Sequence, residues 1–136
     1  MPRFTQMTIE SPKTQTNKSA EELFNFLTDV KNFELLMPES ISKFEVLEND
    51  KFLFALKGMP EIVLKMKEKQ APNKVVLGAA SDKIPFTLTA NITALEASKS
   101  EANLVFEGEF NAMMGMMIKG PITSFIGTLA EKMGKL

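Results

Sequence analysis

The sequence contains no cysteine, histidine, tyrosine or tryptophan. Without cysteine and histidine it can form no disulfide, no Ser-His-Asp or Cys-His nucleophile, and no zinc site with thiolate or imidazole ligands. The acidic pair Glu21-Glu22 stands at a predicted helix start, which is the usual place for such residues, and no close carboxylate pair lies inside an apolar segment. We therefore predict no catalytic residue, no metal site and no cofactor. Whether the protein is an enzyme stays open, with a non-enzyme favoured.

Neither a strong charge nor a long hydrophobic run is present. Sixteen basic and seventeen acidic residues give a net charge of -1, and no Lys/Arg cluster with interleaved aromatic residues occurs, so we expect no nucleic-acid partner. No window approaches the roughly 18 apolar residues of a membrane helix, and residues 1–10 lack the apolar core of a signal peptide. These patterns predict a cytoplasmic protein without a transmembrane segment. A length of 136 residues with 44% hydrophobic content predicts a single domain over residues 1–136.

The N-terminal part predicts a strand followed by helices. Residues 4–15 alternate between apolar and polar positions, and Pro12 indicates an edge position or a bulge because proline cannot donate to a strand ladder. Ser19 and Glu22 have the spacing of a capping box, in which each side chain accepts from the other residue's amide. A helix over residues 20–28 is expected to follow.

A second short helix over residues 31–36 is expected to end before Pro38, because a residue that precedes proline is pushed out of the helical region. From residue 41 onward the apolar period changes to two, and six strands fit the pattern. The alternation is clearest where Ile62, Leu64 and Met66 are interleaved with lysines, which predicts an antiparallel strand with one wet face. Short polar turns between the strands predict antiparallel neighbours.

The last 26 residues, 111–136, predict a long C-terminal helix. Gly120-Pro121 leaves two alternatives. Either residues 111–119 form a separate turn or lid and the helix restarts near Pro121, or one helix is simply kinked there and leaves Met113, Met116 and Met117 exposed. Gly127 and Gly134 are expected on the outer side of this helix. Its apolar stripe, with members three or four residues apart, is Met114, Ile118, Ile122, Phe125, Leu129, Met133 and Leu136.

This order of one strand, two short helices, six strands and a long helix carries a resemblance. Together with the segments Ser19-Ala20-Glu21-Glu22-Leu23-Phe24 and Phe33-Glu34-Leu35-Leu36-Met37-Pro38, it resembles the helix-grip superfamily of START-like and polyketide-cyclase-like proteins (SRPBCC), as a small bacterial-type single-domain member. The resemblance implies an α+β fold in which two short helices and a long C-terminal helix accompany a seven-stranded curved antiparallel sheet. The long helix would lie over the concave face and enclose a deep apolar cavity.

The function that this resemblance implies is binding or carriage of a small hydrophobic or amphipathic ligand, such as a lipid, quinone or polyketide, without evident catalysis. Two alternatives stay open: a protein-interaction or chaperone-regulating module that uses the outer surface, and a weak cyclase or hydrolase. The oligomeric state could be monomer or homodimer. The residues predicted to line the cavity are Phe54, Leu56, Ile62, Leu64, Leu77, Phe86, Leu88, Ala90, Phe106, Phe110, Met114, Ile118, Ile122 and Phe125.

Overall fold

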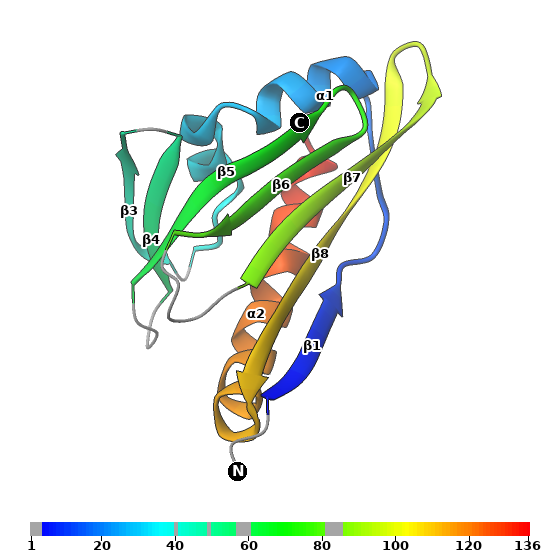
Figure 1. The fold of residues 1–136 in the computed structure, drawn as a ribbon. Coiled ribbons are helices and arrows are strands. Elements are labelled where there is room, and N and C mark those ends of the chain that lie inside the picture. The colour runs from blue at the N-terminus through cyan, green and yellow to red at the C-terminus, as the bar shows by residue number, and fades with distance from the viewer. Residues whose placement is uncertain (1–3, 40, 49, 57–60, 81–85) are drawn as a thin grey trace.

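The computed structural model describes residues 4–39, 41–48, 50–56, 61–80 and 86–136, and only the backbone of residues 4, 5, 111, 112 and 114. The elements follow one another in the predicted order (Figure 1). They are β1 (Phe4–Glu10), β2 (Thr14–Thr16), α1 (Ala20–Leu27), the 3-10 helix η1 (Val30–Leu36), β3 (Ile41–Leu47), β4 (Lys51–Leu56), β5 (Ile62–Gln70), β6 (Lys74–Ala79), β7 (Phe86–Glu96), β8 (Lys99–Asn111) and α2 (Ala112–Met133).

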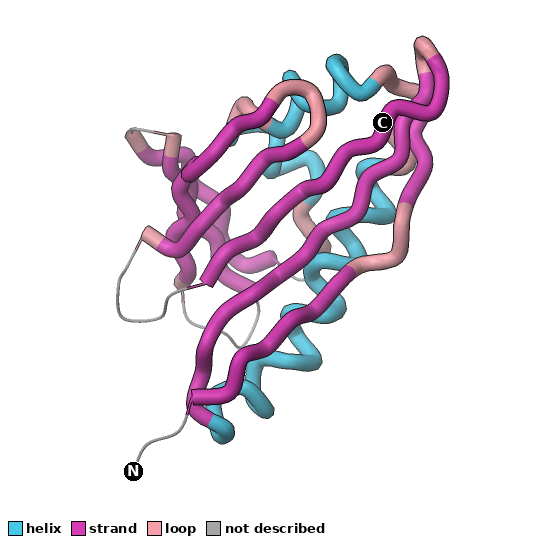
Figure 2. Tube along the Cα trace, turned by 45° about the vertical axis from the view of Figure 1, so that its right-hand side comes forward, coloured by secondary structure: helices cyan, strands magenta, loops and turns pink. Residues whose placement is uncertain are grey.

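One curved antiparallel sheet forms the body of the molecule. Its strands lie in the order β1-β8-β7-β6-β5-β4-β3, and the short β2 pairs with β8 beyond the end of β1. Helix α2 runs along one face of this sheet, while α1 and η1 lie at its upper end in the view of Figure 1 (Figures 1 and 2). The α+β helix-grip architecture expected from the sequence is confirmed.

The first predicted strand is divided into two. Both β1 and β2 pair with β8, but residues 11–13 between them leave the ladder. The Ser11 amide donates to the Leu104 carbonyl, and the Leu104 amide donates to the Ser11 hydroxyl, each at 2.8 Å. A side-chain oxygen thus takes the place of a main-chain acceptor. The interruption falls at Pro12, as expected from a residue without an N–H.

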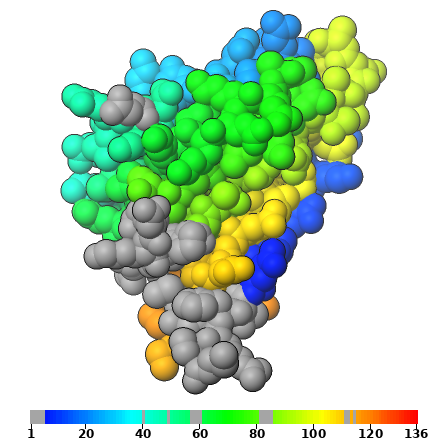
Figure 3. All heavy atoms as spheres, in the orientation of Figure 1, coloured from blue at the N-terminus to red at the C-terminus, as the bar shows by residue number. Residues whose placement is uncertain are grey.

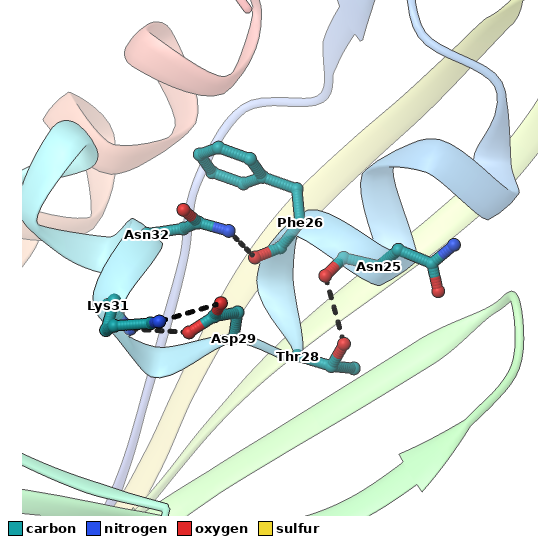
Figure 4. Close-up of polar contacts among 6 residues, drawn as sticks. All are labelled: Asn25, Phe26, Thr28, Asp29, Lys31 and Asn32. Atoms are coloured by element: carbon teal, nitrogen blue, oxygen red, sulfur yellow. Dashed lines mark hydrogen bonds and ion pairs between the residues drawn. The ribbon is translucent and has the colours of Figure 1, made fainter.

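The capping box that starts α1 is confirmed. The Glu22 amide donates to the Ser19 hydroxyl and the Ser19 amide donates to the Glu22 carboxylate, both at 3.1 Å. At the joint between α1 and η1, Asn32 Nδ2 donates to the Phe26 carbonyl at 3.0 Å, and Asp29 accepts from the Lys31 amide at 3.1 Å (Figure 4). These bonds satisfy helix-end groups and fix where η1 begins.

Helix α2 is continuous through Pro121, so the separate lid over residues 111–119 does not form. Pro121 cannot donate to the Met117 carbonyl, but Pro121 is exposed, and solvent can take the place of the missing donor. Of the remaining alternative, the exposure of Met113, Met116 and Met117 is confirmed at 74%, 83% and 68%. The buried side of the helix is wider than the predicted stripe, because Ile126 and Ala130 are also buried.

Candidate ligand-binding site

The inner face of the sheet is covered unevenly by α2. The helix backbone lies close to β1, β2 and β8, on one side of the sheet, and to η1, which itself packs against β3 and β4. Strand β4, on the other side, is reached through side chains: the rings of Phe54 and Phe125 stack at 4.9 Å with an interplanar angle of 8°. Apolar side chains, rather than the helix backbone, therefore occupy the space over the central strands in the part of the chain that the structure describes.

Most of the predicted lining residues lie together in one buried apolar cluster between the sheet and the helices. Ile62, Phe86 and Ile118 are half-buried and pack against this cluster, and the side chain of Met114 lies outside the described residues. The ten that are buried are Phe54, Leu56, Leu64, Leu77, Leu88, Ala90, Phe106, Phe110, Ile122 and Phe125. The sequence thus predicted which side chains meet, while their contact with a ligand stays a prediction.

Three phenylalanine rings fill one end of this interior. Phe86 and Phe106 lie 5.1 Å apart between ring centroids, and Phe106 and Phe110 lie 5.9 Å apart and stacked. They leave no space for a side chain at Gly108, where a Cβ would lie 2.7 Å from the Phe110 ring and 2.8 Å from the Phe86 Cβ. A larger residue at position 108 would therefore have to displace these rings.

Half-buried side chains mark the same end of the interior. Met7, Gly108 and Phe86 lie side by side in register on β1, β8 and β7. The Met7 methyl lies 3.0 Å from the position that a Cβ would take at Gly115, at the start of α2, and Ile118 follows on the next turn. Strand β5, two strands further along the sheet from β7, begins with Ile62 at the same end. We call Met7, Ile62, Phe86 and Ile118 the rim.

Three residues of this end were absent from the predicted lining: Met7, Gly108 and Gly115. The sequence carried a signal for each. Met7 alternates inward on the first predicted strand, Gly108 fills the missing inward position between Phe106 and Phe110, and Gly115 precedes Ile118 and Ile122 at helical spacing. Two of the three are glycines, which a search for apolar side chains passes over.

The buried polar groups lie elsewhere and support the fold. Ser100 donates from its hydroxyl to the Lys18 carbonyl at 2.8 Å, and Asn103 Nδ2 donates to Glu10 at 2.6 Å. The pKa of Glu22 is lowered, chiefly by the hydrogen bond from the Ser19 amide, at the exposed start of α1. Within the described residues, no group of three or more Asp or Glu side chains is placed to hold a metal ion, and no helix is long and apolar enough to cross a membrane.

Comparison with solved structures decides the fold. Norcoclaurine synthase from Thalictrum flavum, solved with a transition-state analogue, matches with a TM-score of 0.75 and 10% identity over 99% of this chain and 96% of its own. A START superfamily protein from Mycobacterium smegmatis matches with a TM-score of 0.65 and 11% identity over 98% and 95%. The chain has the helix-grip fold.

A third helix-grip match is XoxI from Bacillus cereus, with a TM-score of 0.71 and 9% identity over 96% of this chain and 94% of that one. No protein-family model and no curated protein matches the sequence. At about one-tenth identity the likeness extends to the helix-grip architecture and not to the reaction or ligand of any of these proteins.

Proposed function

We propose that the protein binds a small hydrophobic or amphipathic molecule between the sheet and α2, and that the molecule enters at the rim. The observation that carries this proposal is the change in burial along the interior. Side chains at the far end, such as Leu129 and Met133, are 1% exposed, whereas the four rim residues are half-buried. A ligand that covers the rim removes apolar surface from water, at about 25 cal/mol for each Å².

The aromatic side chains next to the rim give the binding site its character. Phe86, Phe106 and Phe110 present ring faces and edges, which suit flat or aromatic ligands. Met7 adds a flexible thioether that repacks around different shapes. A neighbour of the same fold, norcoclaurine synthase, has been solved with dopamine and hydroxybenzaldehyde, which are small aromatic molecules. We extend only the small size and the aromatic ring of such ligands to this chain.

The test uses an environment-sensitive apolar dye, whose emission is measured against a low background because the protein has no tryptophan or tyrosine. Ile118→Asp places a charge at the rim and is expected to weaken dye binding at least tenfold. Met117→Asp is the matched control, since it places the same charge on the adjacent residue of the same helix, where the side chain is 68% exposed. We expect its dye affinity to stay within twofold of the unmodified protein.

Two outcomes would overturn the proposal. Equal weakening by both substitutions would place the dye on the outer face of α2, and an absence of dye binding by the unmodified protein would leave the interior as a solid core. Native mass spectrometry of freshly purified protein gives an independent measurement: a bound apolar molecule that Ile118→Asp loses and Met117→Asp keeps would support the proposal.

A further inference from the structure

The outer side of α2 carries a largely exposed stripe that the ligand-binding proposal does not use. It consists of Met113, Met116, Gly120, Ser124 and Gly127, and we call these five residues the outer stripe. At about 100° per residue they fall within one narrow sector of the helix, opposite the buried Ile122 and Leu129. In Figure 3 the sheet covers most of α2, and the start of the helix, in orange, is visible below it.

Up to Gly127 this side of the helix lacks the charges that a solvated helix face normally carries, and the exposed Glu131 follows one turn later in the same sector. Lys119 is the only charged residue between positions 112 and 130, and it lies about 100° around the helix from Gly120. Met113 and Met116 are nevertheless 74% and 83% exposed. Apolar side chains that gather on an uncharged exposed face are typical of an interaction surface rather than of a face kept in water.

The spacing within the outer stripe points to the partner. Its members are three, four, four and three residues apart, so the order of spacings is the same in both directions around Gly120. Two copies of the helix that cross antiparallel about a two-fold axis at Gly120 would place Met113 opposite Gly127 of the second copy. They would place Met116 opposite Ser124. Each long side chain thus meets a small one, and each Gly120 meets itself.

The structure leaves room for these contacts. A Cβ placed at Gly120 or at Gly127 would meet no atom within 4 Å, so the helix backbone is bare at the centre and at one end of the outer stripe. Two helices can approach closely where both lack a side chain, and the flexible methionines at the other end can fill the hollow over the opposite glycine.

We propose that the outer stripe is the interface of a homodimer, in which two α2 helices pack antiparallel about Gly120. The interface lies on the far side of α2 from the rim, so it does not depend on the proposed ligand. Its contacts are those of an isologous dimer, in which the same surface is used twice. The two interiors and their rims stay separate.

The absence of cysteine permits a direct test by single-cysteine cross-linking. Gly120→Cys is expected to form a disulfide dimer under mild oxidation, because the two copies of residue 120 meet at the axis. Met116→Cys alone and Ser124→Cys alone are expected to cross-link poorly. Like residues lie about 12 Å apart along the helices in the proposed dimer, which exceeds the Cα separation of about 7 Å that a disulfide tolerates. A mixture of these two variants should cross-link to each other.

Leu35→Cys is the control, because Leu35 is also an exposed apolar residue, at 64%, but lies on η1. Sedimentation equilibrium gives a second measurement, in which Met116→Lys is expected to weaken self-association at least tenfold. Cross-linking of Leu35→Cys as fast as Gly120→Cys would mean random collision and would overturn the proposal. So would an unmodified protein that stays monomeric at about 1 mM, where even a weak pair with a Kd of about 1 mM would be populated. Binding of that monomer to phosphatidylcholine vesicles through the methionines would then identify a lipid surface as the partner.

Discussion

The two halves of α2 face the same sheet but are packed differently. In the second half, Ile126, Leu129 and Met133 are each 1% exposed. In the first half, Gly115 is buried, Ile118 is half-buried, and three methionines extend into solvent. The difference lies in what covers each half, since both halves are apolar. The lesson is that one helix can serve as core at one end and present a surface at the other.

Contacts with three other elements bury the second half of α2. Lys132 donates to the Met37 carbonyl just after η1, and Phe125 stacks on Phe54 of β4. Directly after the helix, a Cβ placed at Gly134 would lie only 2.5 Å from the Thr14 methyl of β2. The corresponding close approach in the first half is that of Met7 to Gly115. We therefore expect the second half to contribute most of the stability, and the proposed ligand entry lies at the first half.

The largest expected difference between the halves is in the free energy of unfolding. Leu129→Ala removes a fully buried side chain and should cost about 2–5 kcal/mol. Met116→Ser, in the exposed half, should change stability by no more than about 0.5 kcal/mol. Urea unfolding followed by far-ultraviolet circular dichroism measures both. A loss of more than about 2 kcal/mol for Met116→Ser would mean that this methionine is packed core, and the comparison would fail.

A smaller effect is expected from the buried Ser100 hydroxyl, which links the start of β8 to Lys18, just before α1. Ser100→Ala removes the donor of the Lys18 carbonyl and leaves that part-buried acceptor without its partner, which should cost about 1–3 kcal/mol. Thr123→Ala is the matched control, since the Thr123 hydroxyl also donates to a carbonyl, that of Lys119, but on an exposed helix surface. Equal losses in urea unfolding for the two variants would show that burial of the Ser100 hydrogen bond adds nothing to the free energy of unfolding.

Two glycines of the C-terminal segment should respond in opposite directions. Gly127→Ala should raise stability by about 1 kcal/mol, because alanine is the better helix former and a Cβ there meets nothing within 4 Å. Gly134→Ala should lower stability, because its Cβ would overlap the Thr14 methyl. Thermal unfolding at a concentration low enough to keep the protein monomeric measures both signs. A gain from both substitutions would contradict the tight contact at the end of α2.

Sequence patterns predicted the architecture because local spacing sets it. The capping box of Ser19 and Glu22, the lysine-interleaved strand that begins at Ile62, and the buried stripe of α2 each follow from a helical or strand period. The interruption between β1 and β2 was predicted only in part. Proline signalled a bulge, but the use of the Ser11 hydroxyl as an acceptor depends on where β8 lies.

The sequence predicted which side chains of the site face inward, but not how they pack against one another. Alternation placed Phe86, Phe106 and Phe110 on one face, yet the close approach of the Phe86 Cβ to Gly108 depends on the register between β7 and β8. Gly134 was expected on the outer side, whereas the structure places it against Thr14, because the helix ends at Met133 and the chain turns there. The continuity of α2 through Pro121 could not be chosen from sequence, since proline is compatible with both alternatives.

The smallest expected effect is a change with pH in the stability that the capping box at the start of α1 provides. The pKa of Glu22 in the folded protein is below its ordinary value of 4.5, chiefly because the Ser19 amide donates to the carboxylate. A lowered folded pKa stabilises the protein above about pH 4.5, and this stabilisation is lost as the pH falls through the folded value. The stability advantage of the unmodified protein over Glu22→Gln should therefore shrink between about pH 6 and pH 3. Glu21→Gln, which removes an equal charge from the same turn without touching the capping box, is the control. Parallel pH profiles for the two variants in urea unfolding would show that helix-end charge alone, and not the bond to Ser19, sets the response.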